Sequence, residues 1–252
     1  IVAGGSNVIS GGNSFIAAGA DNTISGSSSF VGAGGGHVVS GSSSAAFGNT
    51  HTVSGSRNAA FGQSNSATNN NSIVAGFQSH TGGNITFSFG YRDSITNVTG
   101  AGIFGGFANT VSANYAVIGG GQNNLVSGGN GFIGGGNANT VSSTNAAAFG
   151  NGNTASGSTA FVAGNSNSAT NTYAAAFGNS NIASGSGSFV AGSSNEVTSG
   201  SGAAFGFDNY VLGANSFVGG TLDTASGYGS FAGNRGNHAS GNHATAFGTY
   251  NT

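Results

Sequence analysis

A short repeat runs through the whole sequence and limits what the chain can fold into. Each copy has three small or apolar residues followed by a residue that we call the anchor, which is Gly in 17 of 18 copies. The anchors are Gly4, Gly19, Gly34, Gly48, Gly62, Gly76, Gly90, Gly106, Gly121, Gly136, Gly150, Gly164, Gly178, Gly192, Gly206, Gly220, Asn234 and Gly248. Twelve of the 17 gaps between them are 14 residues long, four are 15 and one is 16. A period this short is too small for helix-containing repeats or four-stranded propeller blades, and it fits one turn of a narrow β-solenoid.

The repeat predicts an all-β fold, a parallel β-roll or solenoid of about 18 coils with a 14–15-residue repeat. No linker interrupts the pattern, so we interpret residues 1–252 as a single solenoid array. Coils stacked about 4.8 Å apart would give a rod of about 80 Å. The chain begins inside its own repeat, and we expect it to be a fragment of a longer fibre.

Three columns of the repeat have a physical meaning when positions are counted from the anchor. Asn stands three residues after the anchor in 13 of 18 coils, and a stack of Asn in register predicts an amide ladder. Val, Ile or Ala stands five residues after it in 16 of 17 coils, the exception being Thr81. Gly stands seven residues after it in eleven of 17 coils. Because Asn and Gly tolerate positive φ, these two outer columns predict two left-handed corners in each coil.

Phenylalanine alternates with small residues in the triplet before the anchor. In successive coils the first and third triplet residues are Ala147 and Phe149, then Phe161 and Ala163. These two positions lie on one face of a strand, and close packing favours large side chains interleaved with small ones. We therefore predict that the first and third positions fill the core of the coil.

The middle residue of the triplet is apolar as well. It is Ala148, Val162, Ala176, Val190, Ala204, Val218, Ala232 and Ala246 in successive coils. A strand that is apolar on both faces is usually covered on both faces. If the first and third positions face the core, the middle position forms an exposed apolar stripe, which predicts a homo-oligomer built around a cyclic axis.

The repeat resembles the YadA-like heads of trimeric autotransporter adhesins, whose pattern is similar to Ser-Val-Ala-Ile-Gly followed by Ala-x-Gly. Residues 72–76 (SIVAG) and 188–192 (SFVAG) match the first element, and residues 155–157 and 183–185 (both ASG) match the second. The resemblance covers essentially the whole chain. It implies a left-handed parallel β-roll, a homotrimer, and an extracellular position at the exposed tip of a surface fibre. Attachment to an outer membrane would then come from parts not in this chain. Similar repeats occur in viral and phage fibres, so a virion surface is the alternative.

Composition excludes several classes of function. Charged residues make up 3% of the chain and the net charge is −2, whereas nucleic-acid binding needs clustered Lys and Arg. The absence of Cys excludes disulfides and thiolate metal sites, and no apolar run is long enough to insert into a membrane as a helix. We therefore expect no nucleic-acid partner and no membrane insertion by this segment.

Titratable residues are too few and too scattered to indicate catalysis or a cofactor. The sequence contains five acidic residues, five His and three Arg, and no two carboxylates occupy the same position of the repeat in neighbouring coils. His37 and His51 occupy the Asn column in consecutive coils, which predicts rings stacked about 5 Å apart. We interpret both as polar replacements for Asn rather than as metal ligands, and we predict neither an enzyme nor a metal site.

One stretch breaks the pattern in a way that indicates a binding site. The residue after the anchor is usually small or polar, but in three consecutive coils it is Phe77, Tyr91 and Phe107. The same stretch contains His80, Arg92 and Asp93, and also the 16-residue gap. Stacked exposed aromatic rings beside one Arg suit a sugar or a protein partner. The alternative interpretation is that these rings pack against a neighbouring subunit or under the longer loop.

Three functions are compatible with a repetitive chain of low charge. The favoured one is a structural and adhesive segment of a trimeric surface fibre that binds a host surface protein, a matrix protein or a glycan. An ice-binding solenoid would need one residue type along a flat face, but Thr occurs in only six of 17 coils four residues after the anchor, interrupted by Glu196 and Tyr210 among others. The third, an enzyme grafted on a solenoid, lacks the carboxylates that such chemistry needs.

Overall fold

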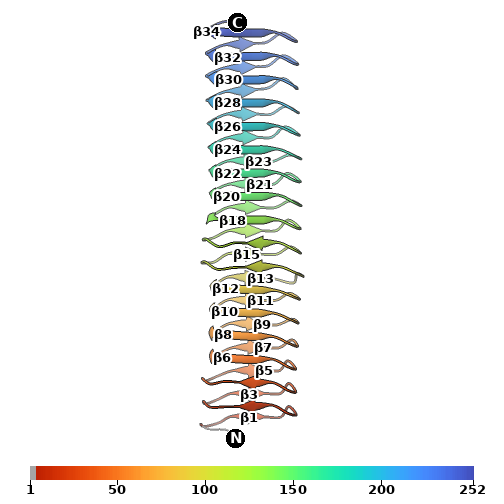
Figure 1. Cartoon of the computed structure of the whole chain (residues 1–252), viewed down its shortest axis with the longest axis vertical. Coiled ribbons are helices and arrows are strands. Elements are labelled where there is room, and N and C mark those ends of the chain that lie inside the picture. Colours follow the sequence, from red (N-terminus) through yellow and green to blue (C-terminus); the bar gives the residue numbers. More distant parts are fainter. Residues whose placement is uncertain (1–3) are drawn as a thin grey trace. The chain divides into compact units, whose positions relative to one another are not determined.

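The computed structural model describes residues 4–252, so the first triplet of the repeat lies outside the described part. Contacts divide the chain into two compact units, Ile1–Val126 (unit 1) and Ser127–Thr252 (unit 2). Within each unit, one coil lies above the next and each contributes two strands (Figure 1). The predicted fold class is confirmed: over the described residues the chain is an all-β parallel β-solenoid of about 17 turns, and equivalent residues of adjacent coils are about 14 positions apart.

The odd-numbered strands have two residues each and form what we call the narrow sheet of each unit. In unit 1 they are β1 (Val8–Ile9), β3 (Thr23–Ile24), β5 (Val38–Val39), β7 (Thr52–Val53), β9 (Ser66–Ala67), β11 (His80–Thr81), β13 (Ser94–Ile95), β15 (Thr110–Val111) and β17 (Leu125–Val126). In unit 2 they are β19 (Thr140–Val141), β21 (Thr154–Ala155), β23 (Ser168–Ala169), β25 (Ile182–Ala183), β27 (Glu196–Val197), β29 (Tyr210–Val211), β31 (Thr224–Ala225) and β33 (His238–Ala239).

The even-numbered strands, most of them longer, form the broad sheet of each unit. In unit 1 they are β2 (Phe15–Ile16), β4 (Phe30–Val31), β6 (Ala45–Asn49), β8 (Ala59–Gln63), β10 (Ile73–Phe77), β12 (Phe87–Tyr91), β14 (Gly102–Ile103) and β16 (Val117–Ile118). In unit 2 they are β18 (Phe132–Asn137), β20 (Ala147–Asn151), β22 (Phe161–Asn165), β24 (Ala175–Asn179), β26 (Phe189–Ser193), β28 (Ala203–Phe207), β30 (Phe217–Thr221), β32 (Phe231–Arg235) and β34 (Thr245–Thr249).

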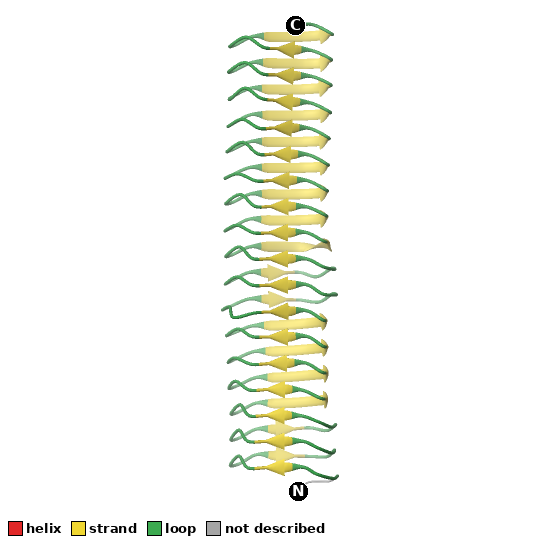
Figure 2. Ribbon diagram, turned by 180° about the vertical axis from the view of Figure 1, so that it is seen from behind, coloured by secondary structure: helices red, strands yellow, loops and turns green. Residues whose placement is uncertain are grey.

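Every strand pairs in parallel with the equivalent strand of the next coil within its unit. In unit 2, for example, Ala147 is aligned with Phe161, and Phe161 with Ala175. Figure 2 shows that strands and loops alternate without a helix among the described residues. Accordingly, no helix capable of spanning a membrane occurs in residues 4–252.

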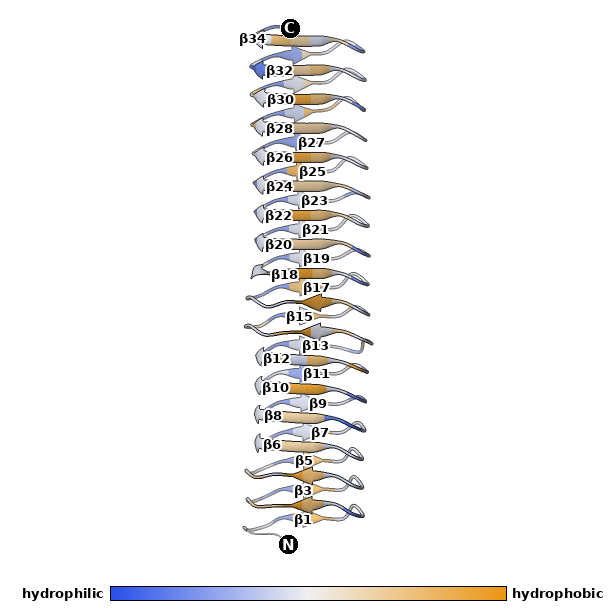
Figure 3. Cartoon of the chain, in the orientation of Figure 1, coloured by the Kyte–Doolittle hydropathy of each residue, from blue (hydrophilic) through white to orange (hydrophobic). Residues whose placement is uncertain are grey.

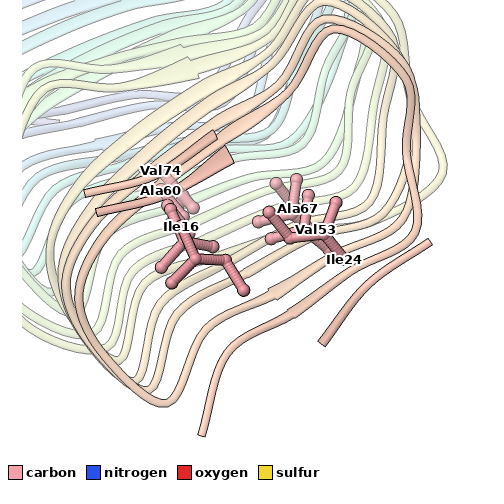
Figure 4. Packing of buried hydrophobic residues seen from close by; sticks show 9 residues of the cluster. Ile16, Ile24, Val53, Ala60, Ala67 and Val74 are labelled. Carbon is pink, nitrogen blue, oxygen red and sulfur yellow. The ribbon is translucent and has the colours of Figure 1, made fainter. Parts of the chain in front are cut away.

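The core is a thin layer between the two sheets, filled by two facing columns of small aliphatic residues. One column stands five residues after the anchor, as Ile24, Val53 and Ala67 do, and comes from the narrow sheet. The other comes from the broad sheet and is the middle residue of the triplet, or the residue before it in the longer coils, as Ile16 is. Figure 4 shows Ile16, Ala60 and Val74 of the broad sheet opposite Ile24, Val53 and Ala67 of the narrow sheet.

The sequence-based assignment of inner and outer faces was therefore wrong. The middle residues that were expected outside are inside, and Ala148, Val162 and Val190 have no exposed surface. The phenylalanines that were expected inside are on the outer face of the broad sheet, where Phe161 and Phe189 each keep 37% of their surface exposed. The physical reason is width, because the layer between two flat sheets in one short coil accommodates Ala, Val and Ile but not a phenyl ring.

The outer rings form a continuous row along the broad sheet, which we call the Phe face. Neighbouring ring centroids in unit 2 are 5.3–6.3 Å apart. The rings of this row are Phe132, Phe149, Phe161, Phe177, Phe189, Phe205, Phe217, Phe231 and Phe247. Unit 1 has the corresponding row Phe15, Phe30, Phe47 and Phe61. Figure 3 shows apolar residues concentrated on even-numbered strands such as β10 and β18.

Rings also stack directly in one column, although close packing was expected to interleave large side chains with small ones. Phe47 and Phe61 both occupy the third triplet position, and their centroids are 5.2 Å apart with planes only 3° from parallel. Phe217 and Phe231 both occupy the first position at 5.3 Å and 2°. On an outer face the rings can lean toward solvent, so the alternation of large and small residues is not needed to avoid a clash.

Two corners of each coil have positive φ, as predicted, but at other positions than the Asn column and the Gly seven residues after the anchor. Apart from glycines, positive φ occurs two and nine residues after the anchor, for example at Ser166 (57°) and Tyr173 (58°); the exceptions among the described residues are the anchor Asn234 (94°) and Asn97 (51°), which stands seven residues after its anchor as predicted. The glycine seven residues after the anchor serves close approach instead, since a Cβ on Gly157 would lie 1.9 Å from the carbonyl oxygen of Asn171. The anchor needs glycine for both reasons: Gly164 has φ +121°, and its Cβ would lie 2.0 Å from the oxygen of Gly178.

The longer gaps of the repeat are absorbed locally. The pairing of β18 with β20 shifts between Ile133 and Gly135, so Gly134 is the additional residue of a bulge. In the 16-residue gap, Ser88 pairs with Ile103 at a spacing of 15, whereas Ser94 pairs with Thr110 at a spacing of 16. The coil register is thereby kept although the repeat length changes.

The predicted amide ladder is confirmed. The side chain of Asn153 donates through Nδ2 to the carbonyl oxygens of Phe149 and Gly164, at 2.8 Å each. Its Oδ1 accepts from the backbone N–H and the side-chain Nδ2 of Asn167, at 2.9 and 3.2 Å. Each Asn therefore bonds within its own coil and to the next coil, and a buried polar column is satisfied without water.

Candidate functional site

The three aromatic residues that follow consecutive anchors form a stacked strip. Phe77 is aligned with Tyr91 in the broad sheet, and an isolated bridge joins Tyr91 to Phe107. The ring centroids of Phe77 and Tyr91 are 5.1 Å apart, and so are those of Tyr91 and Phe107, with planes 17° and 11° from parallel. The predicted stack is therefore present, and Tyr91 and Phe107 keep 37% and 39% of their surface exposed.

Of the described residues, Arg92 supplies the positive charge directly beside this strip. Its guanidinium carbon lies 5.2 Å from the centroid of the Tyr91 ring, a distance that allows a cation–π interaction. Its Nε donates a hydrogen bond of 2.9 Å to Oε1 of Gln78, at the equivalent corner of the preceding coil. Gln78 therefore holds the arginine against the strip, and it was not among the predicted site residues.

The orientation of the rings determines which ligand chemistry fits. Tyr91 is stacked between Phe77 and Phe107, and the guanidinium of Arg92 also lies over its ring, so little of its ring face is left open to a ligand. A sugar that stacks on an aromatic platform needs an open ring face, which only the two end rings can offer. The strip is better suited to contact with apolar side chains of another protein than to a row of sugar units.

Three further rings continue the strip across the broad sheet. The centroid of Phe87 lies 5.8 Å from that of Phe89 and 4.6 Å from that of Phe104, and Phe104 is 59% exposed. Phe87, Phe89 and Tyr91 are alternate residues of β12, so they share its outer face. Phe87 and Phe89 were not among the predicted site residues, because the first and third triplet positions were expected to fill the core.

Two of the predicted site residues do not belong to the strip. His80 lies in β11 of the narrow sheet, beyond the corner that separates it from Phe77, and burial lowers the pKa of its imidazole. Asp93 is 1% exposed and occupies the amide ladder, where its Oδ1 accepts from the backbone N–H and Nδ2 of Asn109 at 2.8 and 3.2 Å. The structure therefore brings together Phe77, Tyr91, Arg92 and Phe107 only.

The surface around the strip is otherwise featureless. No pocket opens on the surface of the described residues, and residues 4–252 contain no cluster of three or more His, Cys, Asp or Glu that could hold a metal ion. Any recognition by this surface would therefore occur on a shallow face rather than in a cleft.

Comparison with known proteins adds no assignment. No protein-family model matches the chain, and none of the curated proteins is significantly similar to it.

Proposed function

We propose that the chain is a structural and adhesive segment of a trimeric surface fibre, in which three left-handed solenoids pack with their Phe faces inward. The observation that carries the proposal is the Phe face itself, a row of nine partly exposed rings on one side of unit 2. The number three, the left hand and the YadA-like family follow from the resemblance of the repeat. The fibre would lie outside the cell, on a bacterial surface or, as the alternative, on a virion.

The size of the Phe face supports association between copies. In unit 2 it spans nine strands of about five residues, which corresponds to about 40 Å by 16 Å, or about 600 Å². Stable protein interfaces bury about 800 Å² on each partner, so the face is of the right order to hold subunits together. Left in water, a patch this large on a chain with 3% charged residues would favour aggregation.

A second copy of the chain is the partner whose surface best fits this face. In successive coils the ring stands alternately at the third and the first triplet position, as in Phe149, Phe161 and Phe177. The pattern of ridges and hollows on the surface therefore repeats every two coils, or about every 9.6 Å. Another copy carries ridges and hollows at the same spacing and can interdigitate along the full length of the face.

The experiment is to determine the mass in solution by light scattering for the chain and for the variant Phe161→Ser/Phe189→Ser. We expect a trimer for the natural sequence and a smaller species for the variant. The matched control, Ile182→Ser/Tyr210→Ser, removes two side chains with similar exposure from the narrow sheet and should leave the trimer intact. A stable monomer at micromolar concentration, or dissociation caused only by the control, would contradict the proposal.

Adhesion to a host or matrix protein would use the aromatic strip, which lies at the edge of the broad sheet next to the corner that carries Arg92. The variant Tyr91→Asn/Phe107→Asn places the commonest residue of that column at both positions and should remove binding while keeping the trimer. Phe207→Asn is the control, because Phe207 occupies the same column but is aligned with Ser193 and Thr221 instead of other rings. Loss of the trimer in the double variant would show instead that the strip is part of the subunit interface.

A further inference from the structure

Two histidines replace asparagine in the buried ladder of unit 1. His37 and His51 stand three residues after consecutive anchors, and neither has exposed surface. Their rings are stacked with centroids 5.0 Å apart and planes 25° from parallel. The predicted spacing is therefore confirmed, and the pair is sealed inside the fold.

The hydrogen bonds of the pair require one tautomer. The backbone N–H of His51 donates to Nδ1 of His37 at 3.1 Å, and the backbone N–H of Asn65 donates to Nδ1 of His51 at 3.2 Å. An Nδ1 atom that accepts a hydrogen bond carries no proton. Both rings are therefore neutral, with their proton on Nε2.

The Nε2 atoms confirm this assignment because they face only acceptors. Nε2 of His37 lies 3.2 and 3.1 Å from the carbonyl oxygens of Ala33 and Gly48, and Nε2 of His51 lies 2.9 Å from that of Phe47. In the Asn coils the same two roles belong to Oδ1 and Nδ2. The neutral imidazole thus reproduces the donor and acceptor of an amide.

A second proton on either ring would break the ladder. It would occupy Nδ1, which would then point a donor at the backbone N–H of the next coil. Two charged rings 5.0 Å apart in a buried column would also repel each other. Burial lowers the pKa of the His51 imidazole from its ordinary 6.5, and the neighbouring His37 lowers it further, while hydrogen bonding to the backbone of Phe47 acts in the opposite direction.

No opposite charge among the described residues compensates for protonation. The ladder neighbours on either side are Asn22 and Asn65, and the core residues of the adjoining narrow strands are Ile24, Val39, Val53 and Ala67. The broad strands of these coils contribute Phe47, Gly48 and Gly62 and no ionisable group. Of the acidic residues of unit 1, Asp21 is at an exposed corner of the coil before His37, and Asp93 is three coils beyond His51. Arg57 lies at the opposite corner of its coil, nine residues after the anchor.

We propose that the His37–His51 pair is an acid-sensitive device that holds the coils of residues 34–65 together at neutral pH and releases them when it is protonated. The direction follows from linkage. Because the folded state binds a proton on His51 less readily than the unfolded chain, the stabilisation is complete above about pH 6.5 and decreases as the pH falls below that value. The proposal concerns unit 1 alone and does not depend on the fibre or on its oligomeric state.

The experiment compares amide hydrogen exchange of the natural chain with that of His37→Asn/His51→Asn, which restores two amides to the ladder. In the natural chain, the protection of residues 38–65, corrected for the intrinsic effect of pH on exchange, should fall between pH 7.5 and pH 5. The fall should be about tenfold for each unit by which the pKa of His51 is lower in the folded state than in the unfolded state. It should remain constant in the double variant. Residues 140–210, whose ladder is entirely Asn, serve as the internal reference, and His238→Asn/His243→Asn controls for the removal of two exposed histidines.

A measurement on the natural chain keeps the proposal testable even if the variant does not fold. The ¹⁵N shifts of both imidazoles at pH 7.5 should show Nε2 protonated and Nδ1 unprotonated. A proton on Nδ1 at this pH, or equal loss of protection in the natural chain and the His37→Asn/His51→Asn variant on acidification, would overturn the proposal.

Discussion

The amide ladders of the two units both satisfy a buried polar column, but the ladder of unit 2 is more regular than that of unit 1. In unit 2, Asn occupies the column in every coil from Asn139 to Asn251 except at Asp223, and the gaps between anchors from Gly136 onward are all equal. In unit 1, His37, His51, Ser79 and Asp93 interrupt the column, and the gaps differ by up to two residues. A buried column therefore accepts other side chains where they reproduce the donor and acceptor of Asn, as the two histidines do.

The irregular ladder and core of unit 1 leave some buried polar groups without a partner. Among the described residues, the buried side-chain atoms without a hydrogen bond are Oγ1 of Thr81, Oγ of Ser88 and Oδ2 of Asp93, all within unit 1. Thr81 and Ser88 are in the core columns, where neighbouring coils have aliphatic residues. An unpaired buried polar atom costs about 1–3 kcal/mol, so residues 81–93 are expected to be the least stable part of unit 1.

The two aspartates of the ladder show how the backbone decides the outcome. Oδ2 of Asp223 accepts a hydrogen bond of 3.2 Å from the backbone N–H of Thr221, the residue after the anchor. The equivalent N–H in the coil of Asp93 belongs to Tyr91 and donates to the carbonyl oxygen of Gly106 at 2.9 Å. The same carboxylate is therefore satisfied in unit 2 and lacks a partner for one oxygen in unit 1.

The largest expected effect on stability comes from replacing glycine at the anchor, a residue that both units need. Gly164→Ala would place a Cβ 2.0 Å from the oxygen of Gly178 at a φ of +121°. Steric conflict with the next coil adds to a backbone cost of about 1–2 kcal/mol, so we expect a loss of more than about 3 kcal/mol in the free energy of unfolding. Urea unfolding would measure it. Gly200→Ala, whose Cβ would meet nothing closer than 3.6 Å, should change stability little, and equal losses in both variants would refute the close-approach argument.

The next largest effect is a change in stability that should differ between the aspartates of the two ladders. Asp93→Asn restores a donor toward the carbonyl oxygens that the Asn coils use, and should stabilise the chain at pH 7 by about 1–3 kcal/mol. Asp223→Asn loses the bond from Thr221 and should give no gain. Urea unfolding at pH 7 would compare the two, and a gain for Asp223→Asn as large as that for Asp93→Asn would show that the unpaired oxygen is not the cause.

The pH dependence of Asp93 gives a second readout. Burial raises the pKa of this carboxyl above 3.8, although two hydrogen bonds from Asn109 lower it. The stability that it contributes is present below about pH 3.8 and is lost as the pH rises through the folded value. Asp93→Asn should abolish this dependence. Measuring it in the His37→Asn/His51→Asn background removes the opposite dependence of the histidines.

The smallest expected effect tests the placement of the rings. Exchanging Ala175 and Phe177 moves one ring into line with Phe161 and Phe189, an arrangement like that of Phe217 and Phe231. We expect a change of less than about 1 kcal/mol for the dissociated chain, because the rings are outside. Ala176→Phe, which inserts a ring into the core at the residue between them, should cost about 1–3 kcal/mol or more. The reverse order of these two effects would contradict the observed inner and outer faces.

The repeat length predicted the fold correctly because a coil this short has few other solutions. The amide ladder and the aromatic stack were also predictable, since equivalent residues of adjacent coils must lie about 4.8 Å apart. The two faces of the broad strand were not, because both are apolar and period-two alternation alone does not say which is inside. Side-chain volume held the missing signal: in unit 2 the inner column of the broad sheet contains only Ala, Val and Ile, whereas the outer positions contain Phe.

The ladder also has a consequence for how such a chain changes over time. Each Asn, like Asn153, bonds only within its own coil and to the coils directly before and after it, so a coil senses its immediate neighbours and not the total number of coils. Duplication or deletion of a whole repeat unit leaves every remaining contact of the same kind. The number of coils can therefore change in evolution without changes in the sequence of each coil. Recombination between repeats can lengthen or shorten the array while the core of the remaining coils stays the same.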